Sequence, residues 1–475
     1  MMLKKGGIIN FLFFAIFTLE LMKIFNCSMR TFSSYFRFLL IGAIWFFLGS
    51  YIIAQTNHIN LQKETEQIIN FLEYSQQKEN HPPNYYKGEW PSYIENIKTI
   101  PLLGKKGKKA YDSNCMVSAS IFVILAEYYI QHPDNNKIKD ILYKAIGNFE
   151  YYRIGEAFHF WHELERTEHL QKGRHKRDPK KYRQRRANVF YYKSQFINAM
   201  MNLAPDSDDA ANVWLSYYLF NKIFKTDSLI IPDSPGKYLD EYSDINRENI
   251  HFYNFFKRHG KETGAFLTWM KEEKKLNLFR IFPGKDFYIP FGVNDIDAVV
   301  NANIVYSLKK MQDTLYPSYQ KAMDFINYCF ETNKYQSAGN YYPTKYNLHY
   351  ITCKAFCSGC TGLEKSLQYI YSQLKSQQLE NGSYPCQIKN NELQASIFAL
   401  NSMIYLKKSG YKGLEENINK VFDFVFSKKL SDKNKIWWTG GIYFSGGTFV
   451  RKSHVWKSDA YTTALVLEAV SNYYE

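Results

Sequence analysis

One kind of helix start recurs five times along this chain of 475 residues, and that recurrence most constrains its fold. The starts lie at Asp112, Asp206, Asp295, Asn391 and Asp459. Each has an Asp, Asn or Ser where a helix N-cap needs an acceptor, followed by small residues and an aliphatic stripe at helical spacing. Separations of 68 to 96 residues leave room for an outer helix, a further pair and a loop. The unit is therefore a helix hairpin of roughly 40 to 50 residues, as in helical repeats.

The segments between these starts supply the partner helices. Segments 134–151, 317–332 and 411–428 have the helical period, and turns rich in glycine and aromatic residues lie at 380–388 and 437–456. Strand signals are few. With 22% charged and 45% hydrophobic residues, the composition is globular and not disordered. The sequence therefore predicts an all-α fold, either an (α/α) toroid of repeated hairpins or an open superhelix.

The N-terminal region carries a membrane signal. Residues 38–54, "FLLIGAIWFFLGSYIIA", contain no charge or proline and nearly reach the roughly 20 residues that cross a bilayer. We expect a transmembrane signal anchor or a signal peptide there. Basic flanks Arg30 and Arg37 keep the N-terminal side cytoplasmic and place the main domain on the extracytoplasmic side. If the weaker apolar run at 8–19 also crosses, the domain returns to the cytoplasmic side.

These signals give a domain plan. The better span lies just after Met29, so part of the preceding segment is untranslated if that methionine is the start. The expected divisions are an N-terminal segment, the span or signal peptide, a polar linker helix and the toroid, at 1–37, 38–54, 55–86 and 87–475.

Several short motifs resemble a known family. "GEWPSY", "NGSYP" and "DAYTTALVLEAV" are similar to the repeats of squalene cyclases and related terpenoid cyclases. "DSDDAA" at 206–211 resembles the DxDDTA signature of class II terpene cyclases, with Ala210 in place of Thr. The resemblance implies an α/α toroid whose inner helix heads open on a central cavity. It also implies that Asp208 donates the proton, with Asp206 and Asp209 polarising it.

Three crowded carboxylates suit that chemistry. Like charges a few ångströms apart cannot all ionise, so one proton stays and its pKa rises. The resemblance therefore implies acid-initiated chemistry on a polyprenyl substrate, with aromatic faces stabilising the cation. An aspartate at a helix head also caps the helix, which explains one acid but not three within four residues.

A second acidic pair keeps other functions open. Asp295 and Asp297 in "FGVNDIDAVV" head the next helix. Paired with the cluster at 206–209, they would suit a glycan-active toroid, a hydrolase or lyase that uses two carboxylates. Carboxylates could equally hold a divalent cation. A non-catalytic binding or scaffold protein is the third alternative.

Basic and aromatic residues supply the candidate binding groups. The run Lys172–Arg186 has nine Lys or Arg against one Asp, and could hold a phosphate, a polyanionic glycan or lipid head groups, or be a solvated loop. The net charge of +15 points the same way. A membrane anchor argues against nucleic acid as the partner. The expected partners are a small lipid or glycan substrate and the membrane, and the predicted substrate-binding residues are Arg185, Arg186, Trp161, Trp438 and Trp456.

No metal or cofactor is expected. His162 and Glu163 begin a HExxH-like run, but Arg166 stands where the second His belongs. "CKAFCSGC" at 353–360 has the Cx3CxxC spacing of iron–sulfur radical enzymes, but lies late in a helical chain without an early glycine-rich strand. A disulfide or zinc site there is the remaining alternative.

Overall fold

The computed structural model describes residues 63–82, 84–99, 105–164, 184–185, 202–247, 262–271, 287, 289, 293–447 and 453–474. The chain divides into two compact units, residues 1–63 and 64–475. The predicted span at 38–54 lies outside the described residues. None of the helices within the described ranges has the length and apolarity needed to cross a membrane.

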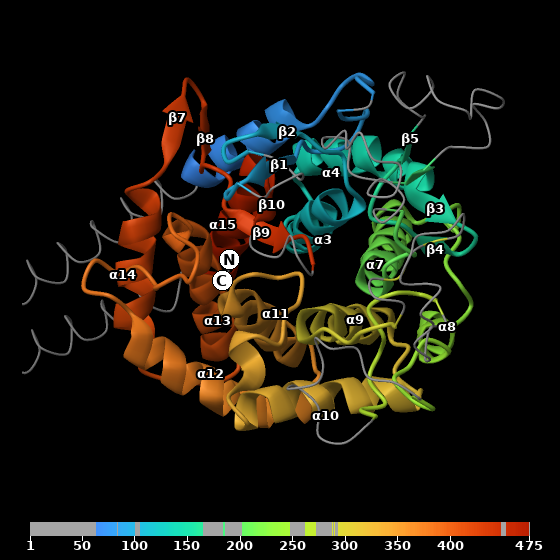
Figure 1. The fold of residues 1–475 in the computed structure, drawn as a ribbon. Helices are drawn as coiled ribbons and strands as arrows, with labels where there is room; N and C mark the ends of the chain where they lie inside the picture. The colour runs from blue at the N-terminus through green and yellow to red at the C-terminus, as the bar shows by residue number, and fades with distance from the viewer. Residues whose placement is uncertain are drawn as a thin grey trace, which may run out of the picture. The chain divides into compact units, whose positions relative to one another are not determined.

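The second unit is built from helix pairs arranged as two rings (Figure 1). The inner ring is α3 (Cys115–Gln131), α7 (Ser207–Phe224), α9 (Ala298–Met311), α11 (Lys345–Cys357), α13 (Glu392–Lys408) and α15 (Asp459–Tyr474). Each packs on the next, and α15 packs back on α3, so the ring closes. The outer layer is a helix at 63–75, α4 (Asn136–Ala145), α8 (Pro235–Asp240), α10 (Pro317–Glu331), α12 (Glu364–Gln377) and α14 (Glu415–Phe426).

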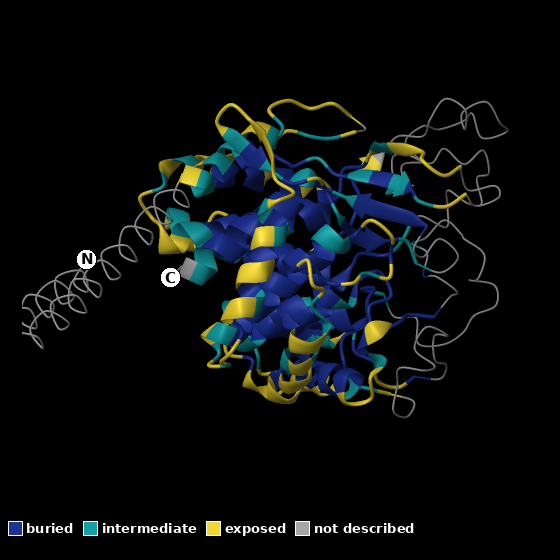
Figure 2. Cartoon of the chain, turned by 90° about the vertical axis from the view of Figure 1, so that its left-hand side faces the viewer, coloured by how far each residue is buried: buried dark blue, intermediate teal, exposed yellow. Residues whose placement is uncertain are grey.

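Burial separates the two rings (Figure 2). Helix α13 is buried on all sides from Gln394 to Leu406. Outer helix α14 buries one stripe of residues at i, i+3, i+4 and i+7, namely Ile418, Val421, Phe422 and Val425. An amphipathic helix covers a core with its apolar stripe, whereas a helix buried all round must lie inside one. The hydrophobic core therefore lies among the inner helices and between the inner and outer rings.

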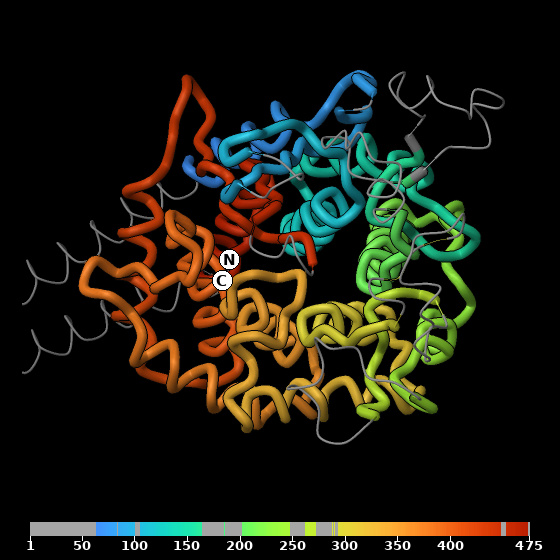
Figure 3. The backbone as a smooth tube through the Cα atoms, viewed as in Figure 1, coloured from blue at the N-terminus to red at the C-terminus, as the bar shows by residue number. Residues whose placement is uncertain are grey.

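The two ends of the toroid are built differently (Figure 3). Connections from an inner to an outer helix are short, as at 225–234 and 409–414. Connections from an outer to an inner helix are long, as at 146–206 and 241–297, and all of them enter at the N-termini of the inner helices. Long loops over a rigid scaffold are where binding and catalytic residues concentrate.

Short strands lie in these long connections, which the all-α prediction did not include. An antiparallel sheet has the order β2-β1-β10-β9 and pairs Ile94 with Trp456. Its strands are β1 (Tyr93–Asn96), β2 (Lys109–Tyr111), β9 (Ile442–Ser445) and β10 (His454–Lys457). Two-stranded pairs are β3 (Arg153–Ile154) with β4 (Ala157–Phe158), β5 (Glu163–Leu164) with β6 (Gln184–Arg185), and β7 (Leu430–Asp432) with β8 (Lys435–Trp437). The larger sheet joins the first and last hairpins of the ring.

The predicted helix hairpins are present, but the number of hairpins between successive predicted helix starts differs from the prediction. The partner helices expected at 317–332 and 411–428 are α10 and α14, and 134–151 contains α4 and a following 3-10 helix. The interval from Asp295 to Asn391 holds a further hairpin, as predicted, whose inner helix is α11. Among the residues that the structure describes, each of the two earlier intervals has one outer helix, α4 in the first and α8 in the second. The linker predicted at 55–86 belongs to the toroid unit from Glu64 onward.

A buried ionic network joins the inner helices near their C-terminal ends. Lys354 on α11 lies 2.6 Å from Glu468 on α15 and 3.0 Å from Glu127 on α3, and its side chain is 4% exposed. Lys310 on α9 also reaches Glu127, at 2.8 Å. Hydroxyls of three tyrosines donate to the two glutamates at 2.6 Å: Tyr306, Tyr350 and Tyr405. Five of the inner helices are thereby linked through three charged side chains.

The network is electrostatically matched. Burial alone would raise the pKa of Glu127, but Lys354 and Lys310 outweigh it and lower that pKa to about 2. Burial would lower the pKa of Lys354, but Glu127 and Glu468 hold it well above its ordinary value. The charges of Glu127 and Lys354 therefore depend on each other.

Removing the central cation is expected to destabilise the toroid strongly. Lys354→Met leaves Glu468 without its ammonium partner and Glu127 with Lys310 alone, and breaking a buried pair costs about 3–5 kcal/mol. The matched control, Lys365→Met, breaks a surface pair with Glu331 and is expected to cost about 1 kcal/mol or less. Urea unfolding of the two variants measures the difference. Equal losses of unfolding free energy in the two variants would contradict a large contribution of this network to stability.

Candidate active site

The N-termini of α7 and α9 hold the predicted acidic residues next to each other on the ring. Asp206 is the N-cap of α7, and Asp297 is the N-cap of α9. The two helices pack directly together. The backbone of 267–269 bridges them, since Ser207 N donates to Thr268 O and Thr268 N donates to Asp295 O. Both predicted acidic pairs therefore lie on adjacent helix heads and not on opposite sides of the toroid.

The Asp208 carboxylate is held by two donors from neighbouring elements. Oδ2 accepts from the Tyr342 hydroxyl at 2.6 Å and from Asn303 Nδ2 at 2.8 Å. Asp208 itself is 2% exposed. The carboxylate is thereby fixed between α7, α9 and the turn that precedes α11.

Asp206 and Asp209 lie beside Asp208 in the same buried site. Burial raises the pKa of Asp206 well above its ordinary value, and the charges of Asp208 and Asp209 and a side-chain hydrogen bond with Asp208 raise it further. Burial, followed by the charge of Asp208, raises the pKa of Asp209 in the same direction. Asp209 Oδ2 is buried without a hydrogen-bond partner among the described residues. The carboxyls of Asp206 and Asp209 therefore retain protons at pH values where isolated aspartates lose them.

The second acidic pair divides into two different environments. Asp297 Oδ1 accepts from the backbone N–H groups of Val299 and Val300, and Oδ2 accepts from those of Asn340 and Tyr341. The two donors on Oδ1 are those of a helix cap, and the two on Oδ2 tie the turn before α11 to the same carboxylate. Asp295 Oδ2 accepts from Asn340 Nδ2 at 2.8 Å and Tyr341 OH at 3.2 Å, while Oδ1 is buried without a partner among the described residues.

Two adjacent tyrosines connect the acidic groups, a feature that the sequence analysis missed. Tyr341 OH binds Asp295, and Tyr342 OH binds Asp208. Both belong to "GNYYP", residues 339–343, before α11. Gly339 is needed because a Cβ there would lie 2.9 Å from the Tyr342 carbonyl oxygen. The available signal was the aromatic pair between a glycine and a proline, but the partners of the hydroxyls are remote in sequence.

An aromatic wall adjoins these tyrosines. Phe444 stacks on Phe160 at 4.9 Å and on Tyr341 at 6.0 Å between ring centroids. Its ring is edge-on to Trp456 at 5.2 Å and to Tyr342 at 5.8 Å. Phe444 contacts Tyr342, whose hydroxyl donates to the Asp208 carboxylate. The aromatic faces of this wall therefore lie near Asp208, where they can stabilise a cation.

Two of the three predicted tryptophans meet at a further acid. The indole N–H groups of Trp161 and Trp456 both donate to Asp112 Oδ2, at 3.0 and 2.6 Å. Trp438 lies elsewhere, fully buried, and donates to the Val425 carbonyl of α14. Trp438 therefore packs between the outer layer and α15, whereas Trp161 and Trp456 belong to the site.

The head of α3 carries another buried carboxyl that the sequence analysis missed. Glu89 accepts from Ser113 Oγ at 2.7 Å and from Tyr152 OH at 2.9 Å. Burial, together with the charge of Asp112, raises the pKa of Glu89 to about 8. Acidic groups thus occupy the heads of α3, α7 and α9.

The remaining predicted residues have these positions. Arg185 donates to the carbonyls of Tyr151, Trp161 and Arg153, which holds β6 against the Trp161 segment. Arg186 and residues 172–183 of the basic run lie outside the described residues. The six described cysteines are free thiols. No cluster of His, Cys, Asp and Glu within the described ranges has the arrangement of a metal site.

Known proteins resemble this chain in structure but not in sequence. No protein-family model matches it, and no curated protein matches it. A variant of the type II terpene cyclase MstE from Scytonema, solved with geranylgeranyl dihydroxybenzoate, superposes with a TM-score of 0.51 at 11% identity, over 87% of this chain and 97% of the cyclase. Cellobiose 2-epimerase from Bacillus thermoamylovorans gives 0.48 at 11% identity, over 88% and 99% of the two chains. That from Spirochaeta thermophila gives 0.46 at 8%, over 88% and 97%.

The likeness to the cyclase establishes the fold. It confirms the expected α/α toroid over most of the chain. At 11% identity it does not carry the reaction across.

Neutralising Asp209 is expected to change the pH dependence of stability. A carboxyl whose folded pKa is raised contributes stability below its unfolded pKa and loses it as the pH rises toward the folded pKa. The stability of Asp209→Asn relative to wild type is therefore expected to grow above about pH 4, by at most about 1.4 kcal/mol per pH unit. Urea unfolding between pH 4.5 and 7.5 measures it, with Asp227→Asn, which changes an exposed residue, as the control. A difference independent of pH would contradict a raised pKa at Asp209.

Proposed function

We propose that this toroid protonates an alkene of a polyprenyl substrate from the Asp206–Asp208 pair. The observation that carries the proposal is the buried, hydrogen-bonded acid pair held by Tyr342 beside an aromatic wall. The structural neighbour MstE, solved with a geranylgeranyl-bearing substrate, supports this substrate class. Ala210, which replaces the threonine of the DxDDTA signature, makes no change to the acidic residues themselves.

The proposed step conserves atoms and charge. The π electrons of the alkene form a C–H bond with the acid proton, and the pair is left with one further negative charge. The cation develops on the more substituted carbon, where the faces of Phe444 and Trp456 stabilise it. Tyr342 and Asn303 donate to Asp208 and hold it in place for the transfer. The cation then loses a proton to water, and the pair takes up a proton from solvent, which completes an isomerisation with no change in the molecular formula.

A second candidate is an acid and base pair that acts on a glycan. Asp295 favours it, because its Oδ1 is buried without a partner among the described residues and its Tyr341 contact adjoins the Tyr342 contact of Asp208. Glycoside hydrolysis uses two carboxyl groups, one as general acid and the other as base or nucleophile. In this case Asp295 and Asp208 are both required, whereas the polyprenyl reaction depends on Asp208.

Residues 38–54 complete the proposal as a membrane anchor. An anchored toroid would take a polyprenyl substrate from the bilayer, where such chains dissolve. The domain would lie on the extracytoplasmic side, or on the cytoplasmic side if residues 8–19 also span.

Asp208→Asn is expected to abolish turnover without unfolding the protein. Purified chain is incubated in D2O with geranylgeranyl-substituted arenes and geranylgeraniol, and products are separated by mass spectrometry. Wild type is expected to give isomers carrying one deuterium, and Asp208→Asn to lose at least about a hundredfold in rate, as loss of an essential acid does. Asp227→Asn, an exposed control, is expected to retain full activity.

The outcomes separate the two candidates. Isomers without deuterium, or undiminished turnover by Asp208→Asn, would exclude protonation by this pair. Release of reducing sugar from oligosaccharides, lost in both Asp208→Asn and Asp295→Asn, would establish the glycan reaction instead.

A further inference from the structure

Two adjoining hollows on the outside of the toroid share the C-terminal end of the helix at 63–75. One has a volume of about 670 Å³ and reaches β1, β2 and the start of α15, and the other, of about 620 Å³, reaches α4 and β8. Tyr74, Gln77 and Lys78 line both. We call the combined surface the Tyr74 groove. It shares no lining residue with the Asp208 site.

The walls of the Tyr74 groove are fixed by buried contacts. Gln76 is 5% exposed, and its amide donates to the carbonyls of Gly88 and Ile141, both at 3.0 Å. Gly88 has φ of 93°, and a Cβ there would lie 2.4 Å from the Lys144 carbonyl oxygen. The loop that carries Lys87 is therefore held directly against Lys144 on α4.

The second hollow is strongly cationic. Its lining contains one carboxylate, that of Glu73, and five lysines: Lys78, Lys87, Lys137, Lys144 and Lys435. Lys137 lies 4.0 Å from Glu73, and Lys435 lies 3.3 Å from Asp432. Lys78, Lys87 and Lys144 have no carboxylate within 4.0 Å among the described residues. Like charges gathered on a fixed surface without counter-charges attract an anion.

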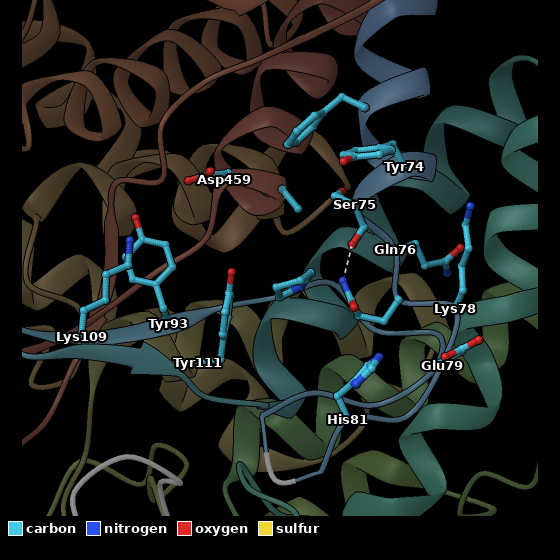
Figure 4. Close-up of a pocket in the computed structure, with 14 residues that line it drawn as sticks. Tyr74, Ser75, Gln76, Lys78, Glu79, His81, Tyr93, Lys109, Tyr111 and Asp459 are labelled. Carbon is cyan, nitrogen blue, oxygen red and sulfur yellow. Dashed lines mark hydrogen bonds between the residues drawn. The ribbon is translucent and has the colours of Figure 1, made fainter. Parts of the chain in front are cut away.

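The first hollow presents aromatic faces with balanced charge (Figure 4). Tyr74 is 64% exposed and Tyr111 is 49% exposed. Lys109 lies 3.4 Å from the ring centroid of Tyr93. Asp459 lines the same hollow. Exposed tyrosines offer an apolar face and a polar edge to one ligand. The carboxylates of Glu79 and Asp459 offset Lys78 and Lys109 in this part of the groove.

We propose that the Tyr74 groove binds an acidic glycan, a chain of sugars bearing carboxylate or sulfate groups. Sugar rings would pack on Tyr74 and Tyr111, sugar hydroxyls would bond to Glu79 and Asp459, and the anionic groups would meet Lys87 and Lys144. A nucleic acid fits less well, because its phosphates would face Glu79 and Asp459 as well as the lysines. This inference holds whichever reaction the Asp208 site catalyses.

Binding of labelled oligogalacturonate and heparin oligosaccharides to the full-length protein tests the proposal. Saturable binding that weakens with salt is expected for at least one of them, with no binding of neutral dextran. Lys87→Gln combined with Lys144→Gln is expected to weaken Kd by about tenfold and to reduce the salt dependence. Lys389→Gln with Lys412→Gln, equal in charge and on exposed residues elsewhere, is expected to change Kd by less than about twofold.

A second variant separates stacking from charge. Tyr74→Ala is expected to weaken Kd while leaving the salt dependence unchanged. Absence of saturable binding, equal loss in both lysine pairs, or tighter binding of an oligothymidylate would each overturn the proposal. Phosphatidylserine vesicles whose binding needs Lys87 and Lys144, with no glycan binding, would overturn it in favour of a lipid surface.

Discussion

The buried position of Lys354 between Glu127 and Glu468 is the interaction on which the toroid most depends. Five of the six inner helices contribute to this network: α11, α3 and α15 supply the three charges, and tyrosine hydroxyls of α9, α11 and α13 donate to the two glutamates. Buried charges require several correctly placed partners, so few arrangements of the inner helices satisfy them all. The network thereby fixes the order and spacing of the ring from one end.

A ring fixed at one end leaves the other end free to carry chemistry. The long connections enter at the N-termini of the inner helices, and the acids of α7 and α9 lie there. Each N-terminus favours a nearby negative charge through its backbone N–H groups. This preference explains why carboxyls accumulate at these heads. Burial, followed by the charges of the neighbouring aspartates, opposes ionisation and raises the pKa of Asp206 and of Asp209.

Local signals in the sequence predicted the helices better than the site. Capping acids and apolar stripes identified five inner helices, but α11 starts after Thr344, whose side chain makes no capping hydrogen bond. The strands were missed because they are two to four residues long, and β1 pairs with β10 from the far end of the chain. Tyr342 was missed for the same reason, since its partner Asp208 is 134 residues away. Contacts between hairpins leave no periodic trace in the sequence.

Asp297 and Asp206 show how one structural position serves two purposes. Both are N-caps, and the sequence around them is alike. Asp297 receives four backbone N–H groups, so its charge is satisfied within the fold. Asp206 caps through one oxygen, whose bond from Asp208 N is 3.4 Å long, and shares a side-chain hydrogen bond with Asp208. A helix cap becomes an acid when the backbone leaves its carboxyl underbonded and a second carboxyl takes the place of a donor.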